Sequence, residues 1–143
     1  MTSTPALRIT LVVASHGEGG LENHVAVLAR GLAARGHRVA LLAHPDFASK
    51  PLGGAVLVPT LLGGPRWNPF NWYRLRRAIA ATRPDVVHAQ ANKAALLVAM
   101  AACCTPWPLV ASVHGTKRQQ WVFRRFHRLI AVSGRNQLMS PGR

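Results

Sequence analysis

The residues best suited to chemistry lie near the start of the chain, in the segment ASHGEGGLENHV, residues 14–25. This segment places glycines, histidines and glutamates between an apolar run and a helical pattern. Glycines allow backbone N–H groups to approach a phosphate closely, and the N-terminus of the following helix carries partial positive charge. Gly19 and Gly20 are therefore candidates for binding phosphate. The alternative is that these glycines only form a tight turn from strand to helix.

Patterns typical of strands and of helices alternate along the chain, and the elements that they predict must position these residues. Continuous apolar runs rich in β-branched residues predict buried strands, and an i, i+4, i+7, i+11 repeat from Leu21 to Leu32 predicts a helix. This alternation is typical of βαβ units, so we predict an α/β fold with a Rossmann-like, doubly wound parallel sheet. The predicted strands span residues 8–14, 39–43, 55–59, 85–89, 109–114 and 129–132, and the predicted helices begin near residues 21, 68, 94 and 117.

Further polar residues stand close to the ends of predicted strands. His114 and His88 end two of them, on the edge where ligands bind in open α/β sheets. Each also has a structural alternative, since a histidine at a strand end can simply bond to a neighbouring loop. The remaining candidates have structural alternatives too. Glu22 could simply be stabilised by the helix N-terminus, Lys93 could be a solvated lysine, and Ser133 could be a helix cap. Those remaining candidates for the cleft are Glu22, His24, Lys93 and Ser133.

Several common site chemistries are excluded by the motifs. A dinucleotide site needs G-x-G-x-x-G, and Glu22 occupies the place of the third glycine. Neither a G-x-x-x-x-G-K-[ST] phosphate loop nor a G-x-S-x-G nucleophile motif occurs. No two of the seven histidines have i, i+3 or i+4 spacing, so we expect no metal site. With four acids in all, of which Asp46 and Asp85 read as loop residues, a two-carboxylate glycosidase is also disfavoured.

The chain is strongly basic, with 18 Lys and Arg against four acids and a net charge of +14. Such a field favours anionic partners. The stretches at residues 67–83 and 116–128 mix aromatic residues with arginines, a composition that suits an anionic membrane surface. The alternative is two amphipathic helices with core aromatics and solvated arginines. We expect no specific nucleic-acid binding, because no RNP, KH or zinc-finger pattern occurs.

Four segments together carry a resemblance to a known family: GGLENHVAVLARGLAARGHRVALLA, RPDVVHAQ, SVHGT and LIAVS. In order and spacing, the chain resembles the N-terminal half of GT-B-fold, family-four glycosyltransferases from residue 8 to about residue 134. The resemblance implies that residues 1–143 form a single Rossmann-like, acceptor-side domain, truncated before a C-terminal donor-binding domain. That second domain would then be supplied by another polypeptide or be lost.

The same resemblance implies an activity. The whole enzyme would transfer a sugar from a nucleotide-sugar to a cell-surface polysaccharide, a lipopolysaccharide or a lipid-linked precursor, with retention and without a metal or other cofactor. Gly19 and Gly20 would face the donor diphosphate, His114 would act at the donor sugar, and His88 would lie on the acceptor side. Gln90 stands where the family often has a second histidine, which argues against a role at that position.

The sequence also bears on where the protein lies in the cell and on whether the chain acts alone. The longest apolar stretch, Ala94–Cys104, is shorter than the roughly 20 residues of a membrane span and predicts a buried helix. We expect a cytoplasmic protein, with the inner face of the membrane as an alternative location. We also expect the chain alone to be inactive. The competing function is a basic α/β binding module for an anionic membrane or nucleic acid.

Overall fold

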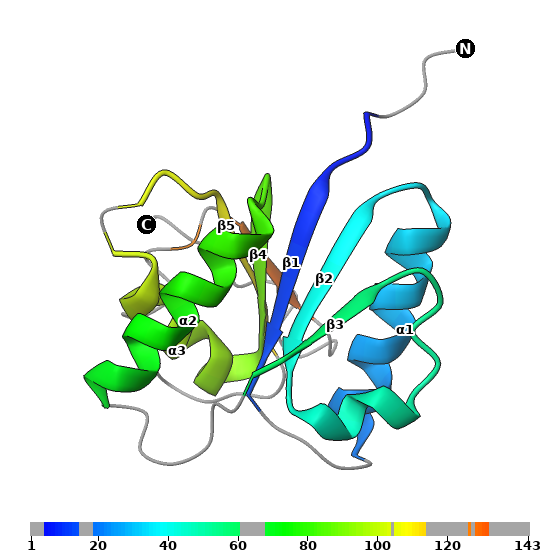
Figure 1. Cartoon of the computed structure of the whole chain (residues 1–143), viewed down its shortest axis with the longest axis horizontal. Helices are drawn as coiled ribbons and strands as arrows, with labels where there is room; N and C mark the ends of the chain where they lie inside the picture. Colours follow the sequence, from blue (N-terminus) through cyan, green and yellow to red (C-terminus); the bar gives the residue numbers. More distant parts are fainter. Residues whose placement is uncertain are drawn as a thin grey trace.

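The computed structural model describes residues 5–14, 19–60, 68–103, 105–113, 126 and 128–131. In this part of the chain, six parallel strands form one sheet in the order β3-β2-β1-β4-β5-β6, and helices pack on both faces (Figure 1). This arrangement confirms the predicted Rossmann-like, doubly wound sheet. The elements are β1 Arg8–Val13, α1 Gly20–Ala34, β2 Arg38–Ala43, the 3-10 helix η1 Pro45–Ser49, β3 Val56–Pro59, α2 Pro69–Thr82, β4 Val86–Gln90, α3 Ala91–Ala101, β5 Leu109–Val113 and β6 Arg128–Ala131.

Strand β1 lies at the centre of the sheet and pairs with both β2 and β4. Its residues after Arg8 are all buried, as expected for a strand covered on both faces. The chain moves from β1 outward to β2 and β3, and then crosses back over the sheet to β4. The strand order therefore reverses between β1 and β4. In open α/β sheets this reversal is the position where ligands bind, at the carboxyl ends of the strands.

Helix α1 covers one face of the sheet. Its inward side carries Val25 and Ala29, both fully buried, which pack with the alternate residues of β1 and β2 that point to this face. Phe47 of η1 completes this apolar cluster and is 0% exposed. Asp46 was read as a loop residue, and the structure places it in this 3-10 helix, which inserts the Phe47 ring into the core.

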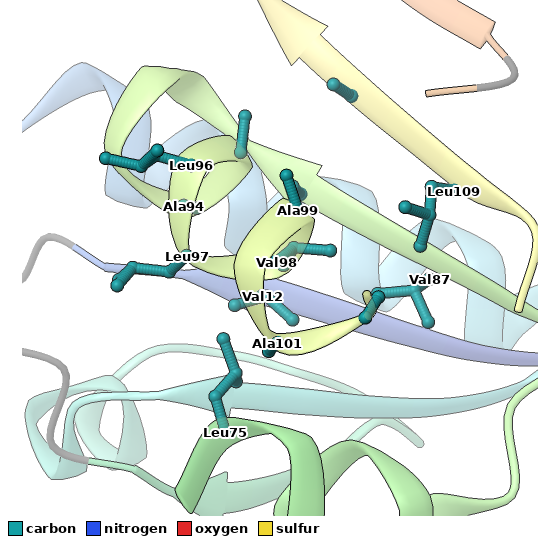
Figure 2. Packing of buried hydrophobic residues seen from close by; sticks show 14 of the residues in the cluster. Val12, Leu75, Val87, Ala94, Leu96, Leu97, Val98, Ala99, Ala101 and Leu109 are labelled. Carbon is teal, nitrogen blue, oxygen red and sulfur yellow. The ribbon is translucent and has the colours of Figure 1, made fainter. Parts of the chain in front are cut away.

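The other face of the sheet is covered by α2 and α3. Residues 94–99 of α3 are all buried, and Figure 2 shows Leu97 and Val98 beside Val12 of β1 and Leu75 of α2. This confirms a buried apolar helix in the Ala94–Cys104 stretch. The helix begins earlier than predicted, at Ala91, directly after β4 and without a connecting loop. None of the described helices combines the length and apolar character that crossing a bilayer would need.

Local signals fix several helix ends. Asn68 caps α2, because its side-chain Oδ1 accepts a hydrogen bond from the Phe70 N–H at 3.0 Å. Gly36 follows α1 with a φ of 94°, the left-handed conformation that favours glycine after a helix. The predicted helix over residues 117–126 falls outside the described residues, except Phe126, which is buried in the α2–α3 core.

Candidate functional site

Three of the described helices begin at the carboxyl edge of the sheet, at the lower side of Figure 1. Helix α1 follows β1, α3 follows β4 directly, and α2 precedes β4 and runs back along the sheet. Their N-termini place partial positive charge at one edge, on both sides of the β1–β4 reversal. This edge is therefore the part of the fold best suited to an anionic ligand.

Gly19 and Gly20 stand at the start of α1 for different physical reasons. Gly19 is the N-cap residue, and an added Cβ there would lie 2.6 Å from Oε2 of Glu22. Gly20 is the first helical residue, and an added Cβ would meet no described atom within 4 Å. Gly20 also lacks a positive φ, so its backbone does not require glycine. Packing against Glu22 therefore accounts for Gly19, whereas no described atom occupies the space above Gly20, where a ligand could lie.

Glu22 and Lys50 set the charge around the start of α1. The Glu22 side chain is buried and folds back beside Gly19, which is the favourable position for a carboxylate at a helix N-terminus. Lys50 follows η1, and its Nζ donates a hydrogen bond of 3.2 Å to Oδ1 of Asn23 in the first turn of α1. Lys50 was not predicted as a site residue, because only the fold of η1 brings it to this edge.

Strands β4 and β5 carry a buried polar pair close to the same edge. His88 is buried, and its Nε2 lies 2.7 Å from the Ser112 hydroxyl oxygen. The two residues lie on neighbouring strands, where His88 is paired in register with Val110. The role of His88 toward an acceptor stays a prediction. Lys93 lies in the first turn of α3, at the carboxyl edge, and is partly exposed.

Of the remaining predicted residues, the structure describes only His24. His24 is exposed on α1, one turn after Gly20. His114 and Ser133 lie outside the described residues, so their roles stay predictions. His114 follows β5, which ends at Val113 two strands away from β1. Two strand spacings correspond to roughly 10 Å, a distance that one nucleotide-sugar can bridge.

A groove at the opposite, amino edge of the sheet has a different character. It has a volume of about 630 Å³, and the residues that line it include Arg8, Arg38 and Arg83. No predicted site residue lines it. Asp85 lies at this edge, where its Oδ2 accepts a 2.8 Å hydrogen bond from the Arg8 backbone N–H, a structural role that agrees with its prediction as a loop residue.

Metal ligands were not expected from the sequence. Within the ranges that the structure describes, no three His, Cys, Asp or Glu side chains lie together in a way that could hold a metal ion. Because other residues of the chain lie outside those ranges, independence from a metal stays a prediction.

The sheet order and the helix N-termini at one edge define the class: a Rossmann-like domain with a ligand edge at the β1–β4 reversal. The family model Glycosyltransferase Family 4 matches residues 18–136, so the chain belongs to that family. No curated protein matches the chain.

Solved structures of similar fold include MurG from Acinetobacter baumannii, with a TM-score of 0.69 and 16% identity over 93% of this chain and 43% of that one. A glycosyltransferase from Rickettsia africae ESF-5 is also similar, with a TM-score of 0.64 and 19% identity over 87% of this chain and 36% of that one. The chain thus spans less than half the length of either structure.

Proposed function

We propose that this chain is the N-terminal, acceptor-side half of a retaining glycosyltransferase that uses a nucleotide-sugar donor. The acceptor would be a glycan or a lipid-linked sugar of the cell surface. The single observation that supports the proposal best is at the N-terminus of α1, where no described atom lies within 4 Å of a Cβ added at Gly20, in a chain that belongs to Glycosyltransferase Family 4. A second domain, either within a longer protein or on another polypeptide, would supply most of the contacts to the donor, and this chain would supply the contact to its phosphates.

In the proposed reaction, the chain stabilises the departing diphosphate. The free N–H groups of the first turn of α1 and the helix dipole together favour an anion, with a dipole contribution of about 0.3–1 kcal/mol at an exposed end. Lys50 adds a positive charge beside the same turn through its bond to Asn23. The negative charge of the Glu22 carboxylate would repel a phosphate on the Gly19 side. We therefore place the phosphate above Gly20. Such prearranged charges suit a step in which negative charge develops on the leaving group.

The sugar end of the donor would lie further along the same edge. We place His114 against the donor sugar, as the catalytic residue, because it follows β5 at the carboxyl edge. His88, held by Ser112, and Lys93 in α3 would lie on the acceptor side. The reaction needs no metal in this proposal, since the helix N-termini and basic side chains take the electrostatic role.

The test is a nuclear magnetic resonance titration of the ¹⁵N-labelled chain with UDP and with GDP, read at the backbone amides of Gly19 and Gly20. We expect the Gly20 amide to shift on titration, and the shift to weaken as salt is raised, because the contact is electrostatic. Gly31→Ala and Gly20→Ala provide a matched pair, since an added Cβ meets no described atom at either position. Both should stabilise α1 by up to about 1 kcal/mol, but only Gly20→Ala should weaken nucleotide binding. Unchanged binding in Gly20→Ala would contradict the proposed phosphate position.

A specific observation also supports contact with an anionic membrane surface. Phe70 and Tyr73 are 75% and 57% exposed in the first turns of α2, close to the ligand edge, instead of being core residues. The Arg77 guanidinium lies 5.9 Å from the centre of the Tyr73 ring, and Arg74 is exposed on the same helix. Exposed aromatic rings beside arginines suit the headgroup region of a bilayer. We therefore propose that α2 brings the cleft to a lipid-linked acceptor.

Sedimentation with vesicles tests this membrane contact. The chain should bind vesicles that contain phosphatidylglycerol, and Phe70→Glu should weaken that binding about tenfold or more. The expected loss has two sources, because the change removes an aromatic ring that the membrane would bury and adds repulsion from the anionic surface. Val27→Glu is the matched control, since Val27 is an exposed apolar residue on α1. Equal losses in both variants would indicate a general charge effect and would argue against docking through α2.

A further inference from the structure

Gln90, the last residue of β4, carries an unusual buried side chain. It is 1% exposed, and neither Nε2 nor Oε1 has a hydrogen-bond partner among the described residues. An unsatisfied buried polar atom destabilises a fold, and few such atoms occur in native proteins. The sequence argued against a role for Gln90, so its burial without partners requires another explanation.

The described neighbours of Gln90 do not supply the missing bonds. Alternation along β4 places Gln90 and His88 on the face opposite to Val87 and Ala89, which belong to the α2–α3 core. In the sheet, Gln90 is paired in register with Val13 of β1 and Ser112 of β5. Val13 is apolar, and the Ser112 hydroxyl already bonds to His88. Gln90 also occupies the N-cap position of α3 but makes no capping bond.

The position of Gln90 points to a ligand. It ends β4 at the reversal of strand order, between β1, which leads to the proposed phosphate position, and β5, which leads to His114. The residue after it, Ala91, has a φ of 70°, a left-handed conformation that costs a non-glycine residue about 1–2 kcal/mol. A strained turn therefore holds an unpaired amide at the ligand edge, and such strain is often found at functional sites.

The chemistry of the amide indicates which part of a ligand it binds. A side-chain amide offers a donor NH₂ and an acceptor oxygen. A phosphate offers acceptors only and would leave Oε1 unpaired, whereas a sugar hydroxyl can both donate and accept. We propose that Gln90 binds hydroxyl groups of the donor sugar, beside the proposed phosphate position at the start of α1. This inference rests on the proposed function. Since Gln90 is shielded, sugar contact requires its surroundings to shift, and the unpaired atoms lower the cost of that shift.

The test follows the side-chain NH₂ resonance of Gln90, assigned by its absence in Gln90→Met. The probes are UDP-glucose, UDP-N-acetylglucosamine and GDP-mannose, each compared with the nucleotide that lacks the sugar. We expect at least one nucleotide-sugar to shift the Gln90 resonance, and UDP and GDP alone to leave it in place. Gln90→Met should lose the sugar-dependent part of the affinity while raising the Tm by about 2–8 °C, because it removes two unpaired polar atoms.

Controls separate this inference from the proposed function. Leu97→Met changes a buried residue on the other face of the sheet and should keep the sugar-dependent affinity. A Gly20 amide that shifts with UDP, without any sugar-dependent change at Gln90, would overturn the sugar contact and leave the phosphate site standing. If neither the Gly20 amide nor the Gln90 side-chain resonance shifted with any probe, both the phosphate site and the sugar contact would be overturned. A Gln90 response to UDP and GDP equal to that of the nucleotide-sugars would also overturn the hydroxyl contact.

Discussion

Gly20→Asp should weaken nucleotide binding at least about fivefold while leaving the fold intact. An aspartate at the first position of α1 suits the helix N-terminus, which stabilises a carboxylate by about 0.3–1 kcal/mol. The same carboxylate would stand in the open space above Gly20, where we place the donor phosphates. Two like charges about 4 Å apart near a protein surface repel by about 1–4 kcal/mol. This corresponds to roughly fivefold to several-hundred-fold weaker binding of UDP, measured by isothermal titration calorimetry.

Gly31→Asp is the control for this prediction. It changes the net charge by the same amount and lies on the same helix, but near the C-terminus, where a negative charge is unfavourable. It should lower the Tm slightly and leave UDP binding within about twofold of the original, since bulk charge is screened beyond about 10 Å in ordinary buffer. If both variants lost binding equally, the nucleotide would be held by the overall positive field and not by the start of α1.

Phe47→Ala should cause the largest loss of stability among single truncations of aromatic residues in the described part of the chain. The Phe47 ring is 0% exposed and fills the core between α1 and the sheet from the short η1 turn. Truncation of a buried phenylalanine costs about 3–5 kcal/mol, against a total stability of about 5–15 kcal/mol for a domain. Urea unfolding followed by circular dichroism measures this loss. Lys50 would also lose its ring contact, since its Nζ lies 5.8 Å from the ring centre.

Phe70→Ala is the matched comparison, because it makes the same chemical change at an exposed ring. Its free energy of unfolding should stay within about 0.5 kcal/mol of the original, while its vesicle binding falls. The two variants should thus show opposite patterns, with stability lost in one and membrane affinity in the other. Similar unfolding energies for Phe47→Ala and Phe70→Ala would contradict the packing of η1.

The order of strands and helices could be predicted because each element carries its own periodic pattern. The buried runs of β1 and α3 are local properties of the sequence, and so are the Asn68 cap and the glycine at residue 36. The alternation of these patterns also indicates parallel pairing, since βαβ connections favour it. The phosphate candidates at Gly19 and Gly20 follow from the same local signal, a glycine turn ahead of a helix.

The tertiary structure decided what depends on residues that are distant in the sequence. Sequence patterns could not distinguish Gly19, which makes room for Glu22, from Gly20, above which no described atom lies. They could not place Phe47 in the core or Lys50 beside Asn23, because η1 has no periodic pattern. They also gave Gln90 no role, since its missing partners become visible only when β1, β4 and β5 lie side by side. Propensity acts on neighbouring residues, whereas burial and hydrogen-bond satisfaction depend on the whole sheet.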